Sequence, residues 1–192
     1  MDEVVQEVIR DKKFYDNSGG GVTLSGGDPL DQPEFALSIL QACKEAGLHT
    51  AIETCGYAPW PTMEKLLEQT DFLLYDIKCA APEKHRAATG KSNERILENA
   101  KRLARCKPMR VRVPLIPGFN DSPEDVKAIV HFVKKEMGSI EIDLLPYNKL
   151  GESKYERLNR PSIESQTIEE AHLEELEKLV RIYPVYNDTD RQ

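Results

Sequence analysis

The chain has 192 residues, of which 40% are apolar and 31% charged, so it can bury one core and is most simply a single domain over residues 1–192. Its 33 acidic and 26 basic residues give a net charge of -7 without a basic cluster, which disfavours binding to nucleic acid or to a membrane surface. A signal peptide and a long apolar run are both absent, which makes the cytoplasm the expected location.

Helical and strand patterns alternate through the first half of the chain. Val4, Val5, Val8 and Ile9 recur at helical spacing, and Pro33 stands where a first helical turn is expected. The predicted elements are a helix over 3–14, a strand over 22–25, a helix from Pro33 to Gly47, a strand over 49–54, a short helix from Pro61 and a strand over 72–78. This last strand is almost continuously apolar, which is typical of a parallel sheet with both faces covered.

The second half continues the alternation. Ser122-Pro123-Glu124-Asp125 combines a cap, a proline and an acidic first turn, and Thr167-x-x-Glu170 has the form of a capping box. The predicted elements are a helix over 92–105, a strand over 109–116, a helix over 122–138, a strand over 140–145, a helix opened by Thr167 and a final strand over 183–187. The alternation predicts an α/β fold whose parallel sheet curves into a partial barrel. Because the pattern opens on a helix, we expect its first strand to be the second of a complete series.

The stretch from Gly19 to Pro29 reads as a short buried strand that runs into a glycine turn. Gly26 and Gly27 let the backbone approach a ligand closely or take positive φ, and Asp28 adds a carboxylate at the turn. A tight connection between a strand and a helix would need the same glycines, so this stretch indicates a site only together with polar residues on later strands.

Ligands of parallel α/β folds bind at the carboxyl ends of the strands, and polar residues gather at these ends. The residues found there are Ser25, Gly26, Gly27, Asp28, Glu53, Thr54, Asp76, Ile77, Lys78, Arg112 and Asn148. Acids, a lysine and an arginine at one mouth suit a ligand with an amine, a carboxylate and a ribose. Structural explanations stay open, because Asp76 and Lys78 share a strand face and could neutralise each other, Glu53 could be an ion-paired filler, and Arg112 could be solvated on an edge strand.

The four cysteines are Cys43, Cys55, Cys79 and Cys106, and they show neither CxxC nor CxxxCxxC spacing. In a reducing cytosol they are expected to be free thiols. Cys55 and Cys79 each follow a strand, so a shared metal site is conceivable, but two distant ligands are a weak signal.

Five sequence blocks together resemble the radical S-adenosylmethionine superfamily, and within it the activating enzymes of glycyl radical enzymes, such as those of pyruvate formate-lyase. The resemblance covers nearly the whole chain. The blocks are the glycine stretch at 18–29, Glu-Thr-Cys-Gly at 53–56, Asp-Ile-Lys at 76–78, Val-Pro-Leu-Ile-Pro-Gly-Phe-Asn-Asp at 113–121 and Leu-Leu-Pro-Tyr-Asn-Lys-Leu-Gly at 144–151.

The resemblance implies a binding site for S-adenosylmethionine. Its amino group would lie at the turn of Gly26, Gly27 and Asp28, with Asp76, Lys78 and Asn148 around its methionyl and ribosyl parts. Glu53, Thr54 and Asp76 would flank a monovalent cation. In the family a 4Fe-4S cluster reduces the sulfonium to form a 5′-deoxyadenosyl radical, which removes hydrogen from a glycine of the partner enzyme.

Four departures from the family pattern stand out. Asp28 occupies a position that is usually Glu, Glu53 one that is usually Asp, and Asn148 replaces a histidine seen in some members. The CxxxCxxC motif that binds the cluster lies before this region in the family and has no counterpart here. We therefore expect a carboxyl-terminal portion without catalytic or cluster-binding residues, inactive by itself and with the cluster in the intact protein only.

Two hypotheses of function follow. The first is the cofactor-binding and partner-docking portion of an activating enzyme, with a glycyl radical enzyme as its partner. The alternative is a non-catalytic module that binds a nucleoside or docks on a protein. A missing strand would also leave a sheet edge on which two copies could pair.

Overall fold

The computed structural model describes residues 2–148, 157, 159 and 167–182, and it is an α/β structure. Its helices are α1 (Asp2–Arg10), α2 (Lys12–Ser18), α3 (Pro33–Glu45), α4 (Trp60–Leu67), α5 (Pro82–Thr89), α6 (Glu94–Leu103), α7 (Pro123–Phe132) and α9 (Glu170–Ile182). A 3-10 turn, η1 (Pro29–Asp31), follows the first strand, and a π turn, η2 (Val133–Met137), continues α7.

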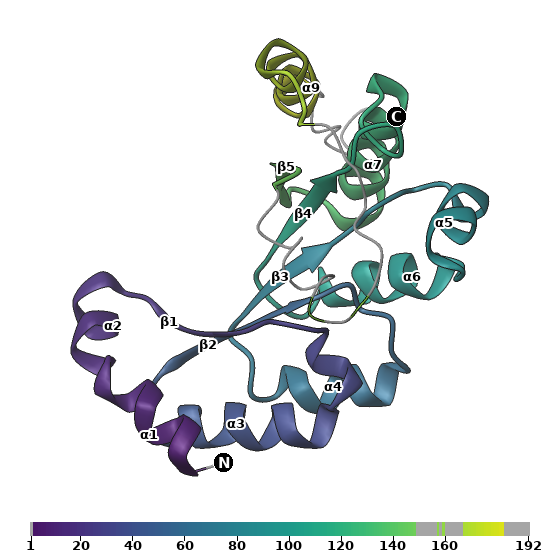
Figure 1. Cartoon of the computed structure of the whole chain (residues 1–192). Helices are drawn as coiled ribbons and strands as arrows, with labels where there is room; N and C mark the ends of the chain where they lie inside the picture. Colours follow the sequence, from purple (N-terminus) through teal and green to yellow (C-terminus); the bar gives the residue numbers. More distant parts are fainter. Residues whose placement is uncertain (1, 149–156, 158, 160–166, 183–192) are drawn as a thin grey trace, which may run out of the picture. The chain divides into compact units, whose positions relative to one another are not determined.

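The strands are β1 (Gly21–Leu24), β2 (His49–Thr54), β3 (Phe72–Asp76), β4 (Met109–Leu115) and β5 (Glu141–Pro146), and they follow one another in the parallel sheet in chain order. Figure 1 shows the elements coloured along the sequence. The chain divides into two compact units, Met1–Asp76 with Asn93–Val111, and Ile77–Ser92 with Arg112–Gln192. The single domain predicted over 1–192 stays a prediction.

The first unit packs α3, α4 and α6 against one face of β1, β2 and β3. Leu24 pairs in register with Ile52, and Ile52 with Leu73. Both Ile52 and Leu73 are completely buried, together with Leu40 of α3 and Met63 of α4. Burial of large apolar side chains on this one face therefore holds the three strands and their helices together.

The opposite face of the same strands is only partly covered. Along β3 the side chains alternate, with Leu73 and Tyr75 fully buried and Phe72, Leu74 and Asp76 half-buried. The apolar sequence of this strand predicted two covered faces, but the structure leaves its second face half exposed. Polar residues on this face can therefore reach a ligand.

The second unit packs α7, η2 and α9 with β4 and β5. Val113, Leu115, Val126, Ile129 and Leu176 form its buried apolar centre. The amide of Ile77 donates to the carbonyl of Arg112 over 3.0 Å, which joins the chain after β3 to β4. His172 of α9 bonds through Nε2 to the carbonyl oxygen of Asp121 at 2.8 Å.

Most predicted elements are confirmed, with β2 found at its predicted bounds. The helix predicted over 3–14 is two helices, because the chain breaks at Asp11, whose carbonyl accepts from the amides of Phe14 and Tyr15. The last helix begins at Glu170, and its first intrahelical bond runs from the amide of Leu173 to Glu169, not Thr167. The strand predicted over 183–187 lies outside the described residues.

The helix α5 was not predicted. Its sequence has few apolar residues and no clear periodicity, so it lacks the apolar stripe by which a buried helix is recognised in a sequence. Its ends are nonetheless typical of a helix, with Pro82 in the first turn and Gly90 at φ 77° after the last one.

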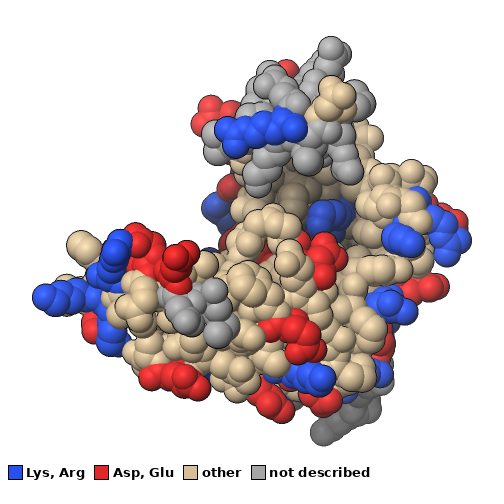
Figure 2. Space-filling view, turned by 60° about the horizontal axis from the view of Figure 1, so that its bottom comes forward, with Lys and Arg blue, Asp and Glu red and all other residues tan. Residues whose placement is uncertain are grey.

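The described helices are short, and the charged side chains are of both signs. None of the helices in the described part of the chain is long and apolar enough to cross a bilayer. Acidic and basic side chains are interspersed on the face shown in Figure 2, in keeping with the balanced composition.

An ion pair between α5 and α7 ties the second unit together. Lys84 Nζ lies 2.7 and 2.6 Å from the two carboxylate oxygens of Asp125. Burial alone would raise the pKa of the Asp125 carboxyl, but hydrogen bonds from Lys84 and Ser122 outweigh it and hold this pKa below its ordinary value. The lowered pKa means that the ionised carboxylate stabilises the folded state.

We expect Asp125→Asn to lower the free energy of unfolding near neutral pH by about 1 kcal/mol. Because the pKa is lowered on folding, this contribution is complete above the ordinary carboxyl pKa and is lost as the pH falls through the folded-state value. Urea unfolding across the acidic range should therefore show the wild type and the variant converging. Glu83→Gln on the exposed side of α5 is the control, and a difference that persists at the lowest pH would contradict the prediction.

Candidate functional site

The turn after β1 is joined to the end of β2 by the carboxylate of Asp28. Asp28 caps η1 by accepting from the amide of Leu30 at 3.0 Å. The same carboxylate accepts from the hydroxyl of Thr54, at 2.8 and 2.9 Å to its two oxygens, and from the amide of Cys55 at 2.9 Å. One side chain thus fixes the positions of two consecutive strand ends.

Thr54 continues this set of hydrogen bonds into the loop that follows β2. Its hydroxyl donates to Asp28 and accepts from the amide of Gly56 at 2.9 Å, and the residue is only 2% exposed. Hydrogen bonds in such a chain polarise one another, and a low-dielectric setting strengthens them. The loop therefore leaves β2 in one defined direction.

Gly56 lies directly against Tyr75 of β3. Gly56 has φ 69°, and a Cβ at this position would overlap the hydroxyl end of the Tyr75 ring. The Tyr75 side chain is completely buried and its hydroxyl donates to the carbonyl of Ile96 at 2.6 Å. Burial raises the pKa of the Tyr75 phenol well above its ordinary value, with further increases from Cys55 and Asp28, so Tyr75 acts as a neutral donor.

Asn99 of α6 holds the loop from its other side. Its amide nitrogen donates to the carbonyls of Gly56 and Ala58 at 2.8 and 2.9 Å, and the residue is 3% exposed. The two carbonyls lie in a loop, outside the backbone hydrogen bonds of the helices and strands. A buried carbonyl without a partner destabilises the fold, so the bonds from Asn99 stabilise the loop. The loop over 55–58 is thus fixed by Asp28, Thr54, Tyr75 and Asn99.

Glu53 and Asp76 lie on the half-exposed face of the sheet. Glu53 pairs in register with Leu74, and Asp76 follows Leu74 by two residues, so strand alternation places all three on the same face. Thr54, one residue later, points to the opposite, buried face with its register partner Tyr75. The first unit therefore brings Asp28 and Thr54 into contact and places Glu53 and Asp76 on one sheet face.

Ser25, Gly26 and Gly27 form the exposed part of the turn after β1. Gly26 has φ 121°, and a Cβ at either glycine would meet no other atom within 4 Å. The backbone of this turn is therefore open to close approach.

The remaining predicted site residues belong to the second unit. Ile77 is completely buried, Lys78 and Arg112 are half-buried, and Asn148 is exposed after β5. Asn120 fixes the chain at Lys78, because its amide nitrogen donates to the carbonyls of Lys78 and Pro114 at 2.7 and 2.8 Å. Its side-chain oxygen accepts from the amide of Ile116 at 2.7 Å.

The cysteines do not form a metal site within the part of the chain that is described. None of the four forms a disulfide, and no group of three or more Cys, His, Asp or Glu converges there to hold a metal ion. Burial raises the pKa of the Cys79 thiol, which disfavours the thiolate needed for ligation. These residues therefore do not fit an iron-sulfur cluster.

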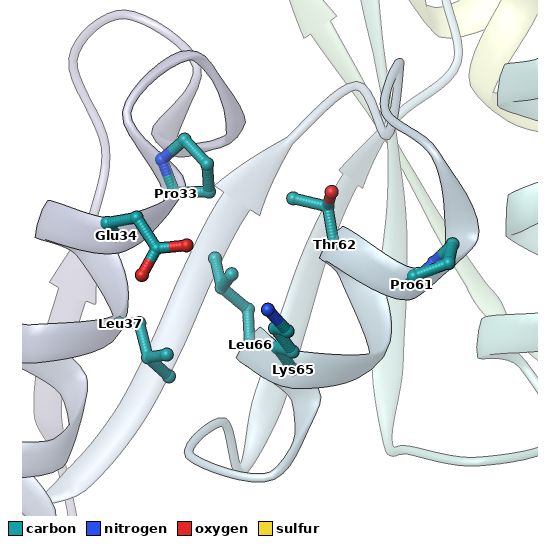
Figure 3. A pocket seen from close by; sticks show the side chains of 7 residues that line it. All are labelled: Pro33, Glu34, Leu37, Pro61, Thr62, Lys65 and Leu66. Carbon is teal, nitrogen blue, oxygen red and sulfur yellow. The ribbon is translucent and has the colours of Figure 1, made fainter.

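A small pocket of about 90 Å³ opens between the first turns of α3 and α4. Figure 3 shows Glu34 of α3 and Lys65 of α4 at this pocket, with the Leu66 side chain between them and Leu37 below Glu34. It involves none of the predicted site residues.

Sequence reasoning missed Tyr75, Asn99 and Asn120, which hold the strand-end loops. Tyr75 and Asn99 gave no local signal, because their partners lie 21 or more residues away. Asn120 could have been noticed, since it follows Pro117-Gly118 in a turn where asparagine often bonds to nearby backbone.

Comparison with known proteins gives consistent similarities. The family model described as Radical SAM superfamily matches residues 1–133. The isethionate sulfite-lyase activating enzyme of Oleidesulfovibrio alaskensis is 49% identical over 163 residues, which cover 83% of this chain and 52% of that protein. The choline trimethylamine-lyase activating enzyme of the same organism is 40% identical over 189 residues, with coverage of 95% and 61%.

Among solved structures, a domain of pyruvate-formate lyase-activating enzyme from Bacteroides vulgatus superposes with a TM-score of 0.70 and 30% identity, covering 84% of this chain and 93% of that one. The chain thus spans a little over half the length of the two relatives matched by sequence, at 52% and 61%.

We expect Gly56→Ala to destabilise the protein by about 2–4 kcal/mol, because it combines a positive φ with overlap on the Tyr75 ring. Urea unfolding measures the loss. Gly27→Ala is the matched control for stability, since a Cβ there meets open space. Equal stability of the two variants would show that the loop does not pack on Tyr75 as described.

The contact between Asp28 and Thr54 predicts coupled energetics. Asp28→Ala and Thr54→Val should each destabilise the fold, and the double variant should lose about 1 kcal/mol less than the sum, because both single changes break the same hydrogen bond. Chemical unfolding of the four proteins gives this coupling energy. Hydrogen exchange at Cys55 should also become faster in Asp28→Ala, and additive losses with unchanged exchange would contradict the contact.

Proposed function

Since the chain belongs to the radical SAM superfamily, we propose that it is the S-adenosylmethionine-binding and partner-docking part of a protein that activates a glycyl radical enzyme. The observation that carries this proposal is the rim formed by the fixed strand ends of the first unit. An open glycine turn and two carboxylates on a half-exposed sheet face are available there, while Asp28, Thr54, Tyr75 and Asn99 hold the surrounding backbone in place.

The glycine turn is suited to an ammonium group. The backbone at Gly26 and Gly27, next to Ser25, is open on its side-chain side, so carbonyl oxygens of this turn can accept from the amino group of the ligand. Asp28 is bound to Leu30, Thr54 and Cys55, and in this proposal it shapes the turn that receives the amine.

The two carboxylates of the sheet face are suited to the charged end of the ligand. Glu53 and Asp76 are proposed to flank a monovalent cation beside the methionyl carboxylate, since hard cations prefer oxygen ligands. The Thr54 hydroxyl, also predicted at this cation, lies on the buried face and is bonded to Asp28 and to the amide of Gly56, so it is left out of the proposed ligands. For Lys78 and Asn148, the assignment to the methionyl and ribosyl parts rests on the sequence resemblance alone, and Ile77 and Arg112 stay predicted cofactor-binding residues.

The radical chemistry belongs to S-adenosylmethionine with a reducing iron-sulfur cluster. The described residues do not fit that cluster, so no reaction step is assigned to this chain. Its residues bind and orient S-adenosylmethionine, and the chain by itself is expected not to cleave it.

The proposed partner is a glycyl radical enzyme. Two of the relatives matched by sequence, described above, are named for the activation of isethionate sulfite-lyase and choline trimethylamine-lyase. Pyruvate formate-lyase is instead named in the description of the similar solved domain. The partner class is therefore proposed without choosing pyruvate formate-lyase as the target.

Calorimetric titration with S-adenosylmethionine tests the binding site. We expect saturable binding in potassium buffer, and a loss of affinity of about tenfold or more in Glu53→Gln and Asp76→Asn, because each removes a charged acceptor. Replacement of potassium by tetramethylammonium should weaken binding of the wild type and have less effect on the two variants.

Glu64→Gln on the exposed side of α4 is the matched control and should bind like the wild type. Thermal unfolding of each variant separates lost affinity from lost folding. A wild-type chain that folds but does not bind S-adenosylmethionine, or equal affinity in all four proteins, would refute the proposal.

A further inference from the structure

A second site lies beside the rim, between the segment that follows β2 and helix α6. It is an open groove of about 370 Å³, lined by Ala58, Pro59 and Trp60 on one side and by residues 94–102 of α6 on the other. The groove belongs to the first unit and involves none of the residues proposed to bind S-adenosylmethionine.

Two arginines of α6 stack on aromatic rings at this groove. The guanidinium carbon of Arg95 lies 5.2 Å from the centre of the Tyr57 ring, and that of Arg102 lies 5.3 Å from the Trp60 ring. A guanidinium group over an aromatic ring is held by a cation–π contact, and this contact uses none of its N–H donors. Both arginines are thereby held in position at low entropic cost.

The charges around the two arginines are not balanced in the same way. Arg102 Nε donates to Glu98 at 3.2 Å, and Lys101 Nζ lies 2.8 Å from the other oxygen of Glu98. These hydrogen bonds hold the pKa of the Glu98 carboxyl below its ordinary value. Among the described residues, Arg95 makes no hydrogen bond or ion pair besides its ring contact. Its N–H groups are therefore available to an incoming acceptor.

The segment that faces the arginines is held by hydrogen bonds from α6. Asn99 lines the groove and fixes the carbonyls of Gly56 and Ala58, as described above. Tyr57 lies between these two residues and is 40% exposed. A ligand here meets a surface formed in advance, which lowers the entropic cost of binding.

The composition of the groove favours a protein segment. Trp, Tyr and Arg are the residue types that contribute most to binding energy at protein interfaces. Glu94 and Glu98 line the groove, and Arg102 is paired with Glu98, so the groove can neutralise one carboxylate at Arg95 and would repel a ligand with many adjacent negative charges. Pro59 and Trp60 offer apolar contact beside the guanidinium of Arg95. A peptide segment that carries an acidic residue next to an apolar side chain therefore matches this surface.

We propose that this groove docks an acidic segment of the protein substrate, with a carboxylate bound by Arg95 and an apolar side chain against Pro59 and Trp60. This rests on the proposed function in one respect, since it takes the glycyl radical enzyme as the source of the segment. The groove begins at Ala58, two residues after Gly56, so a partner that docks there lies next to the rim.

Trp60 is the single tryptophan of the chain, so its fluorescence reports on the groove directly. The probe is a blocked synthetic peptide of three Glu-Ala-Leu repeats, compared with the same peptide carrying Gln in place of Glu. We expect a saturable change in Trp60 emission with the Glu peptide, and affinity about tenfold lower for the Gln peptide. Arg95→Gln should lower affinity for the Glu peptide about tenfold, which corresponds to about 1.4 kcal/mol.

Arg105→Gln, an exposed arginine just beyond α6, is the matched control and should leave peptide affinity unchanged. The proposal fails if no saturable binding is found, if the two arginine variants lose affinity equally, or if the Gln peptide binds as well as the Glu peptide. It also fails if glutarate alone gives the same response, which would indicate a site for a small dicarboxylate. A change in emission on dilution of the chain alone would likewise contradict it, because the groove would then bind a second copy of the chain. Titration with S-adenosylmethionine is independent of these outcomes, so failure here leaves the proposed cofactor site untouched.

Discussion

Backbone groups that leave a parallel sheet must find new hydrogen-bond partners, and in this protein two buried asparagines supply many of them. Asn99 donates to two carbonyls of the loop after β2. Asn120 donates to the carbonyls of Lys78 and Pro114 and accepts from the amide of Ile116, at the end of β4. An amide side chain offers both donors and an acceptor, so a single residue can fix a loop that has no regular structure. The loop after β2 and the segment after β3 are therefore fixed by side-chain hydrogen bonds in place of a backbone ladder.

The same requirement accounts for the role of Asp28 in the proposed site. Asp28 bonds to a backbone amide of its own turn and to two groups at the end of β2. In the proposed site, the open side of the glycine turn and the carboxylates of Glu53 and Asp76 would be left for recognition. Preorganisation and recognition would then be divided between different side chains, with the backbone of the turn held in place before a cofactor arrives.

Sequence patterns predicted the alternation of strands and helices well, because apolar periodicity and end signals are local. The glycine turn and the polar strand ends were also visible locally, and they identified the rim. The partners of Asp28 and Asn99 were not predictable, since Thr54, Gly56 and Ala58 lie 26 or more residues from them and only the fold joins them. Helix α5 was missed for another reason: its few apolar residues leave no periodic signal, and its ends alone mark it.

The π turn at Val133–Met137 bears on how the chain can vary in length. Each turn of this type holds one residue more than an ordinary α-helical turn, while Val133 and Met137 at its two ends stay buried. Loss of one residue from the three between them would convert the turn to a regular one without exposing either apolar contact. We therefore expect a one-residue deletion at this turn, before Gly138 leads the chain into β5, to be tolerated better than one within α7.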